Sequence, residues 1–173
     1  IGPSPKAVEA IREALKDLNR YPDGYSYRLR QRLADKLGVR EEEIVFGNGS
    51  NEIIELLTRT FLQEGDQVIM PAPSFLMYEI MVQAVGAKPL KVALKDLQID
   101  LQKMEASVSP NTRMVFVNNP NNPTGTVVCR DAFEGFLKRI PPEVIVVVDE
   151  AYIEFVRDDN CARGLDYLHS DHM

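Results

Sequence analysis

Two hydrophobic patterns alternate along the chain. In some segments apolar residues recur every three or four positions, which is typical of amphipathic helices, and between them lie short apolar runs typical of buried strands. The helical pattern covers residues 5–18, 27–37, 53–62, 75–85, 101–107 and 130–139. The strand pattern covers residues 43–46, 67–70, 88–94, 113–117 and 144–148. This alternation predicts an α/β fold in which helices flank a mostly parallel sheet.

Three polar loops follow predicted strands at their carboxyl ends. They are residues 47–51, 118–125 and 149–152. In open α/β sheets, ligands bind beyond the carboxyl ends of the strands. We therefore expect these loops, which are far apart in the sequence, to meet at one binding crevice.

The first loop, Gly47-Asn48-Gly49-Ser50-Asn51, precedes a predicted helix. Glycine permits a tight turn and a close approach of the backbone to a ligand, and the amides at a helix start attract anions. Ser50 and Asn51 add side-chain donors, so a phosphate group is the expected ligand. The same residues are also typical of an ordinary helix-capping turn, and Glu52 disfavours a second anion there.

The other two loops carry amide and carboxylate groups. Residues 118–125 contain four asparagines and two prolines, which make the loop stiff and rich in donors, although both residue types also favour ordinary turns. Asp149 ends an apolar strand, where a carboxylate is partly desolvated and needs a partner. That partner is a following segment that it caps, an arginine, or the protonated nitrogen of a heterocyclic ligand. Tyr152 would place a phenol near the same ligand.

Composition narrows the classes of function. The 20 Lys and Arg against 26 Asp and Glu give a net charge of −6, which argues against nucleic acid or an anionic membrane as partner. No apolar stretch approaches the roughly 20 residues of a membrane helix. Cys129 and Cys161 lack a CxxC spacing, so we interpret them as reduced, inert thiols of a cytoplasmic protein. His169 and His172 lack further ligands in register, so no metal site is predicted.

Two motifs carry a resemblance to a known family. Asn121-Asn122-Pro123-Thr124-Gly125 follows one predicted strand, and Val146-Val147-Val148-Asp149-Glu150-Ala151-Tyr152 ends another. Together they resemble the pyridoxal-phosphate-dependent aminotransferases of fold type I. Four segments are most similar to the histidinol-phosphate aminotransferase family: Arg20-Tyr21-Pro22, residues 47–52, residues 73–78 and residues 149–155. The resemblance runs in order over nearly the whole chain.

This resemblance implies cofactor-binding roles for several loop residues. Ser50 and Asn51, with backbone amides, would hold the cofactor phosphate. Phe75 would stack on the pyridine ring, and Asn122 would contact the phenolic oxygen. The family also implies cis peptide bonds before Pro73 and Pro123.

The resemblance assigns the remaining roles to an aspartate and two tyrosines. Asp149 would pair with the pyridine nitrogen and keep it protonated, and Tyr152 would contact the phenolic oxygen. These two are the candidate catalytic residues. Tyr21 would reach the cofactor phosphate of a neighbouring subunit, which implies a homodimer.

The implied reaction is transamination of small molecules in histidine biosynthesis. L-histidinol phosphate and 2-oxoglutarate would give imidazole acetol phosphate and L-glutamate. Residues 1–40 are expected to form an N-terminal helical segment, and residues 41–173 the front part of the large, cofactor-binding domain. The family's Schiff-base lysine is expected beyond Met173, so we expect an incomplete domain and an inactive chain.

Other functions remain compatible with the same residues. The related choices are a fold-type-I aminotransferase for aromatic amino acids and a threonine-phosphate decarboxylase. A non-catalytic remnant that binds pyridoxal phosphate or a nucleotide is a third possibility. A plain dinucleotide-binding domain is disfavoured because residues 47–52 lack the third glycine of GxGxxG.

Overall fold

The computed structural model describes residues 2–169, and the chain divides into two units, one ending at Val45 and the other beginning at Phe46. The first unit contains α1 (Pro5–Ala14), η1 (Leu15–Asp17), α2 (Tyr27–Leu37) and η2 (Glu41–Glu43). The predicted helix over residues 5–18 is therefore an α-helix continued by a 3₁₀ turn. The helix α2 ends at Gly38, whose positive φ of 70° is the left-handed conformation that glycine favours at helix ends.

The strand predicted over residues 43–46 is wrong. The carbonyls of Glu41 and Ile44 accept hydrogen bonds from the Arg30 guanidinium of α2. Val45 is 72% exposed, and Ile44 and Phe46 are only partly buried, so no residue of this apolar run is fully buried. A side-chain donor thus satisfies the carbonyl of Ile44, which the predicted strand would have paired with another strand.

The second unit is built on a parallel sheet. Its elements are α3 (Gly49–Phe61), β1 (Gln67–Ala72), α4 (Met77–Ala84), β2 (Lys88–Ala93), α5 (Leu101–Ala106), β3 (Thr112–Asn118), α6 (Arg130–Leu137), β4 (Ile145–Asp149), η3 (Ile153–Phe155) and η4 (Gly164–Tyr167). Within residues 46–169 the strands form one four-stranded sheet in the order β2-β1-β3-β4, and each neighbouring pair is parallel. The prediction of an α/β fold with a parallel sheet flanked by helices is confirmed.

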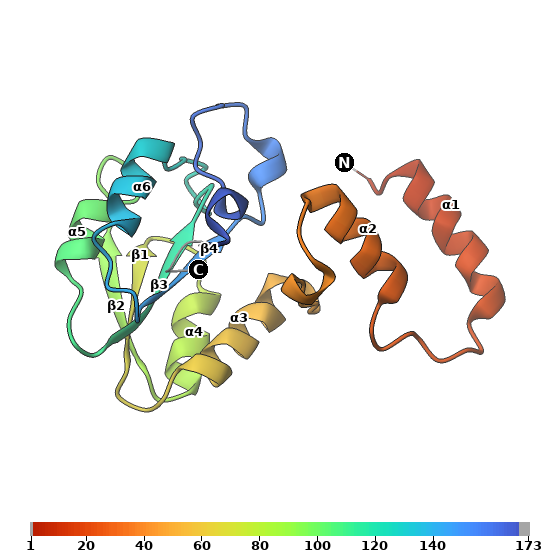
Figure 1. Cartoon of the computed structure of the whole chain (residues 1–173), viewed down its shortest axis with the longest axis horizontal. Coiled ribbons are helices and arrows are strands. Elements are labelled where there is room, and N and C mark those ends of the chain that lie inside the picture. The colour runs from red at the N-terminus through yellow and green to blue at the C-terminus, as the bar shows by residue number, and fades with distance from the viewer. Residues whose placement is uncertain (1, 170–173) are drawn as a thin grey trace. The chain divides into compact units, whose positions relative to one another are not determined.

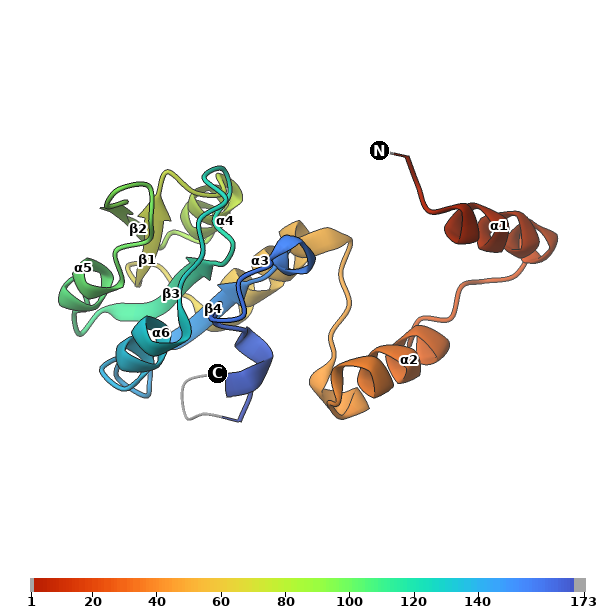
Figure 2. The same ribbon diagram turned by 90° about the horizontal axis from the view of Figure 1, so that it is seen from above.

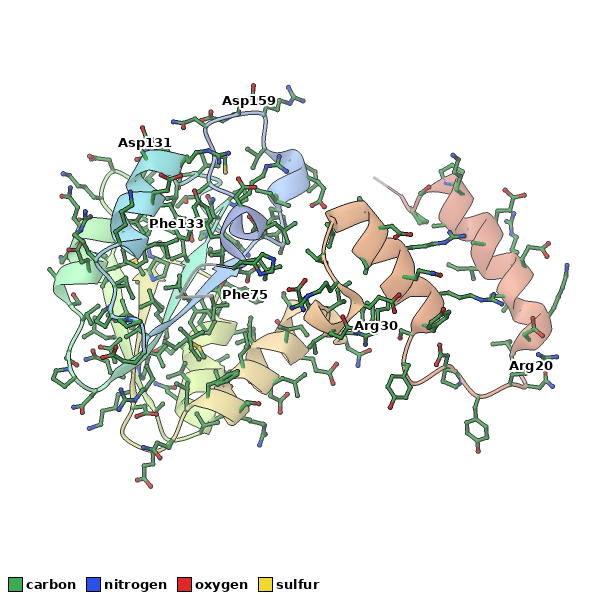
Figure 3. All side chains as sticks on the ribbon, in the orientation of Figure 1. Arg20, Arg30, Phe75, Asp131, Phe133 and Asp159 are labelled. Carbon is green, nitrogen blue, oxygen red and sulfur yellow. The ribbon has the colours of Figure 1, made fainter. Side chains whose placement is uncertain are left out.

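Helices cover both faces of this sheet (Figures 1 and 2). On one face, α5 and α6 supply Met104, Phe133 and Phe136 to a core cluster with residues of β1, β3 and β4. On the other face, α3 and α4 supply a second cluster that includes Ile54 and Tyr78. In Figure 3 the labelled Phe133 lies among the side chains packed between α6 and the sheet. The two clusters hold the carboxyl ends of the strands in place.

Backbone features shape the loops at those ends. The peptide bonds before Pro73 and Pro123 are cis, as predicted, and the bond before Pro120 is also cis. Gly125 has a φ of 71°, which closes the asparagine-rich loop in a conformation that favours glycine. Between residues 2 and 169, no helix is both long and apolar enough to cross a membrane.

Candidate functional site

Residues from four separate segments line one pocket at the carboxyl edge of the sheet. They come from the first turn of α3, the connection between β1 and α4, the loop after β3 and the turn after β4. The lining residues are Ser50, Phe75, Asn118, Asn122, Asp149, Ala151 and Tyr152. The structure therefore brings together members of all three predicted loops.

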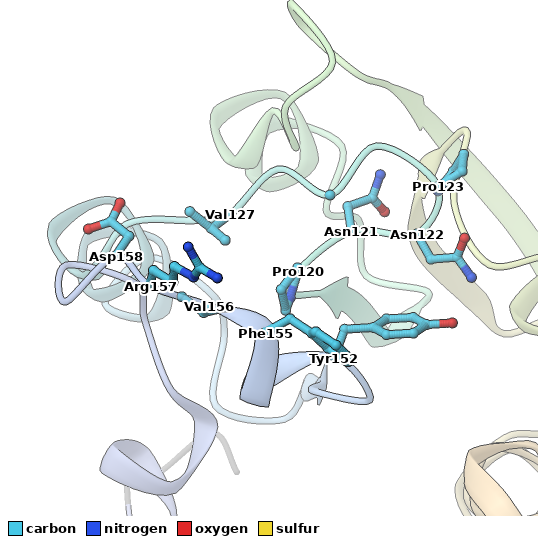
Figure 4. Close-up of a pocket in the computed structure, with 11 residues that line it drawn as sticks. Pro120, Asn121, Asn122, Pro123, Val127, Tyr152, Phe155, Val156, Arg157 and Asp158 are labelled. Atoms are coloured by element: carbon cyan, nitrogen blue, oxygen red, sulfur yellow. The ribbon is translucent and has the colours of Figure 1, made fainter. Parts of the chain in front are cut away.

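A larger pocket adjoins this one. The smaller pocket encloses about 40 Å³, and the adjoining pocket encloses about 420 Å³, within the usual range for small-molecule sites. Asn122 and Tyr152 line both pockets. Figure 4 shows these two side chains on the loops after β3 and β4, with Phe155 and Arg157 further along the second loop.

Both carboxylate oxygens of Asp149 have protein donors. Oδ1 accepts a hydrogen bond from the Ala151 amide at 3.1 Å, so the carboxylate caps the turn that follows it. Oδ2 accepts a hydrogen bond from the Tyr78 hydroxyl at 2.6 Å. The capped turn is one of the partners that the sequence predicts for Asp149, and the Tyr78 hydroxyl is a partner that it does not predict.

Tyr78 links the carboxylate to the aromatic side of the pocket. Its side chain is fully buried, and its ring stacks on Phe116 with centroids 4.4 Å apart. Phe75 and Tyr78 form a T-shaped pair, with ring centroids 5.6 Å apart and planes at 86°. Burial, reinforced by the charge of Asp149, raises the pKa of the Tyr78 phenol, so it stays a hydrogen-bond donor at ordinary pH.

Tyr78 lies in one of the segments that resemble the family, residues 73–78, but the sequence predicts no role for it. It lies three residues after Phe75, which precedes α4, and belongs to the first turn of that helix. Only its contact with Asp149, which is 71 positions away, reveals its part in the site. Local spacing gives no signal for such a contact.

Most asparagines of the second loop serve the fold. Asn119 and Asn121 are buried, and their side chains bond to other parts of the chain. Asn121 accepts a hydrogen bond from Ser74 at 2.8 Å and donates one to Thr124 at 2.9 Å. Asn122 is only partly buried and lines both pockets. The loop is therefore a rigid platform that presents Asn122.

The start of α3 combines a donor cluster with one acidic residue. Glu52 accepts hydrogen bonds from the backbone and side-chain nitrogens of Asn48, so its carboxylate caps the amide that precedes the helix. The amides of the first helical turn have no partner within a helix, and Ser50 adds a hydroxyl that lines the pocket. This edge of the pocket suits an anionic group.

Two predicted site residues lie outside the lining of this pocket. Asn51 is exposed on the first turn of α3. Tyr21 belongs to the first unit and is fully exposed. Their roles remain predictions.

The remaining reactive side chains fall into three groups. Glu150 is partly buried and accepts a hydrogen bond from the Gly164 amide at 2.7 Å, and burial raises the pKa of its carboxyl group.

Cys129 and Cys161 are partners in an antiparallel bridge, a proximity that their separation in the sequence does not reveal. Of the histidine pair, His172 lies outside the described residues. Within residues 2–169, no group of three or more His, Cys, Asp or Glu could hold a metal ion.

Taken together, the pocket offers an aromatic face, a carboxylate, a phenol, an amide and an anion-binding helix start. A planar heterocycle that carries both a basic ring nitrogen and an anionic group would find a partner for each part. The Asp149 carboxylate suits the nitrogen, and the start of α3 suits the anion.

Known proteins share both the sequence and the fold. The family described as aminotransferase class I and II matches residues 1–169. Histidinol-phosphate aminotransferase of Moorella thermoacetica is 45% identical over 168 residues, which cover 97% of this chain and 44% of that protein. The chain thus spans less than half the length of this relative.

Solved structures of aminotransferases share the fold of this chain. The histidinol-phosphate aminotransferase of Sinorhizobium meliloti, in complex with pyridoxal-5'-phosphate, superposes with a TM-score of 0.87 at 28% identity, over 92% of this chain and 44% of that one. The aspartate aminotransferase of Rhizobium meliloti gives a TM-score of 0.83 at 25% identity, over 99% of this chain and 46% of that one.

Proposed function

The chain belongs to the family of class I and II aminotransferases, and we propose that the full-length protein is a pyridoxal-phosphate-dependent histidinol-phosphate aminotransferase. The reaction would convert L-histidinol phosphate and 2-oxoglutarate to imidazole acetol phosphate and L-glutamate in histidine biosynthesis. The substrate assignment is supported by the 45% identity to a relative of that name over nearly the whole chain.

One observation carries the cofactor proposal. Ser50, Phe75, Asn122, Asp149 and Tyr152, which lie on four segments far apart in the sequence, line a single pocket. Each group matches one part of pyridoxal phosphate. An arrangement that serves only the fold would not need five chemically different groups facing the same space.

The phosphate end of the cofactor would lie at the start of α3. Ser50 would donate its hydroxyl, and the first-turn amides would donate with the helix dipole in support. Asn51 is proposed as a further donor at this end. Tyr21 would bind the phosphate in the partner subunit of a homodimer.

The ring end would be held between an aromatic face and a carboxylate. Phe75 would stack on the pyridine ring, and Asn122 and Tyr152 would donate to its phenolic oxygen. Asp149 would accept a hydrogen bond from the protonated ring nitrogen. Because Tyr78 donates to Oδ2 of Asp149 at 2.6 Å, the carboxylate is held in a fixed orientation. When bound, pyridoxal phosphate supplies an electron sink for bonds broken at the substrate's α-carbon.

The proposed organisation follows from the same family. Residues 1–40 would form the N-terminal helical segment and residues 41–173 the front part of the large domain. The protein would act in the cytoplasm on small amino-acid and 2-oxo-acid substrates.

Substitution of Asp149 tests the cofactor proposal in the full-length protein. We expect Asp149→Asn to lower kcat by about 100-fold or more and to alter the visible absorption of bound cofactor, because the ring nitrogen loses its anionic partner. Asp159→Asn, at an exposed position, is the matched control and should change neither. Full activity and an unchanged spectrum in Asp149→Asn would refute the assignment.

A substrate panel tests the specificity. We expect kcat/KM to be highest for L-histidinol phosphate, with phenylalanine and aspartate as competing amino donors. A preference for phenylalanine would identify an aromatic-amino-acid aminotransferase, and loss of carboxylate as carbon dioxide from a phosphorylated amino acid would identify a decarboxylase.

A further inference from the structure

The two cysteines of the chain lie opposite each other at a short antiparallel bridge. The amide of Arg130 donates to the carbonyl of Asn160 at 2.8 Å, and the amide of Ala162 donates to the carbonyl of Val128 at 3.0 Å. Both hydrogen bonds belong to residues that flank the cysteines. Cys129 and Cys161 therefore form a non-hydrogen-bonded pair, in which the two Cα atoms are typically about 4.5 Å apart.

This backbone arrangement suits a covalent link. Side chains at directly opposed positions of an antiparallel pair emerge on the same face. Disulfides join cysteines whose Cα atoms are about 4.4–6.8 Å apart, and a non-hydrogen-bonded pair lies at the short end of that range. We propose that Cys129 and Cys161 form a reversible disulfide when the protein meets a small oxidised disulfide such as oxidised glutathione.

The two thiols differ in access to solvent. Cys129 is partly buried and lines a pocket of about 720 Å³ between the loop after β2 and α6. Cys161 is 1% exposed, and its Sγ accepts a hydrogen bond from the Asn119 amide nitrogen and donates one to the Ala162 carbonyl, both at 3.4 Å. Burial raises the pKa of the Cys161 thiol. Cys129 is therefore the thiol that reacts first.

The reaction balances with oxidised glutathione as the oxidant. The Cys129 thiolate attacks one sulfur of oxidised glutathione, which forms a mixed disulfide and releases one glutathione thiolate. Cys161 then loses its proton and attacks the Cys129 sulfur, which expels the second glutathione. Two protein thiols are oxidised, and one glutathione disulfide is reduced to two thiols.

The link would lie beside the candidate site. The Asn119 side chain bridges the same two segments, because it donates to the Ala162 carbonyl at 2.8 Å and accepts from the Val128 amide at 2.8 Å. The backbone amide of Asn119 donates to the carbonyl of Asp149 at 2.9 Å. A disulfide would thus fasten the segment after Tyr152 to the segment after the asparagine-rich loop.

Peptide mapping of the native full-length protein tests this proposal without any assay of activity. After incubation with oxidised glutathione and blocking of free thiols, we expect a linked pair of peptides that contain Cys129 and Cys161, lighter by two hydrogens than the reduced pair. Added dithiothreitol should separate them. Absence of the linked pair from the native protein, or its formation only in urea, would overturn the proposal.

Single variants test the order of the two steps. In Cys161→Ser we expect glutathione to remain attached to Cys129, because no second thiol displaces it. In Cys129→Ser we expect Cys161 to stay largely unmodified while the protein is folded. Amide hydrogen exchange at Arg130 and Ala162 reports whether each variant keeps the bridge, so a folding defect is recognised directly. Rapid modification of Cys161 in a variant with intact protection would also overturn the proposal.

Discussion

The two units use similar helices in different ways. In the second unit, α3, α4, α5 and α6 each contribute buried residues to one of two clusters on the sheet. In the first unit, α1 buries no residue and α2 buries only Ala34. Apolar side chains along α1, η1 and the residue that follows η1 form a stripe that stays exposed, including Ile11 at 62%, Leu15 at 54% and Leu18 at 75%.

The two units show that the formation of a helix and the burial of its apolar face are separate properties, although one hydrophobic pattern is used to predict both. The spacing of apolar residues predicts where a helix forms, and it does so in both units. It does not predict what the apolar face packs against, since a face is buried only where a partner surface exists. Under the proposed homodimer, the exposed stripe of the first unit would gain its partner through assembly.

The largest expected effect is in the core of the second unit. Phe116 is fully buried and stacks on Tyr78, so we expect Phe116→Ala to lower the free energy of unfolding by about 3–5 kcal/mol. Chemical denaturation of the full-length protein measures this, and the loss should not depend on protein concentration. A loss below about 1 kcal/mol would mean that the core around residue 116 repacks to fill the space of the missing ring.

Leu15→Ala is the counterpart in the first unit. Because Leu15 is 54% exposed, we expect little loss where the protein is monomeric and a larger loss where dimers form. Denaturation at a series of protein concentrations distinguishes the two states. An equally large loss at every concentration would contradict the contrast between the units.

A smaller effect is expected from the hydrogen bond between Tyr78 and Asp149. Tyr78→Phe keeps the ring stack but leaves the carboxylate with one donor fewer, so we expect a loss of about 1.5–3 kcal/mol in the free energy of unfolding. Cofactor affinity should weaken by about 10-fold, because the carboxylate is less firmly oriented. Tyr27→Phe in α2, where the side chain is 58% exposed, should change neither quantity.

The sequence predicts the sheet better than it predicts the contacts across it. Continuous apolar runs such as 144–148, bounded by turn residues, identify parallel strands because both of their faces are covered. The run over 43–46 also holds consecutive apolar residues but is not a strand, and the carbonyl of Ile44 accepts a hydrogen bond from Arg30 of α2 instead. The bond between Tyr78 and Asp149 and the pairing of Cys129 with Cys161 depend on tertiary structure, so no local pattern signals them.

Two glycines with left-handed backbone, one in each unit, allow a matched test in which each substitution is expected to lower stability by about 1 kcal/mol. Gly38 has a φ of 70° and Gly125 a φ of 71°, and an added Cβ would meet nothing within 4 Å at either position. Each substitution to alanine should therefore cost about 1 kcal/mol from the backbone alone. Only Gly125→Ala should also weaken cofactor binding, since Gly125 lines the larger pocket. Hydrogen exchange of α2 and of the loop after β3 measures the local loss of stability in each variant. Equal cofactor affinity in the two variants would contradict the expected difference between Gly38 and Gly125.

The smallest expected effects come from two carboxylates that respond to pH in opposite directions. Burial raises the pKa of Glu150 in the second unit, so its folded form binds a proton more tightly than its unfolded form. Stability is therefore lost as pH rises from the ordinary value of 4.5 through the raised value. Hydrogen bonds from the Tyr27 and Tyr25 amides lower the pKa of Asp23 in the first unit, so stability is lost as pH falls from the ordinary value of 3.8 through the lowered value.

Neutral amides in place of these carboxylates should reveal the two signs. Glu150→Gln keeps an acceptor for the Gly164 amide and removes a desolvated charge, so at neutral pH we expect a gain of about 1 kcal/mol or less that disappears in acid. Asp23→Asn removes the charge that attracts two amides, so the Tyr27 amide should exchange faster at neutral pH, and that difference should also disappear in acid. Exchange of the Gly164 and Tyr27 amides, followed from acid to neutral pH, measures both. If both variants changed protection in the same direction, the two carboxylates would not differ as their surroundings indicate. Burial of Glu150 disfavours its charged form, whereas the two amide donors of Asp23 favour its charged form.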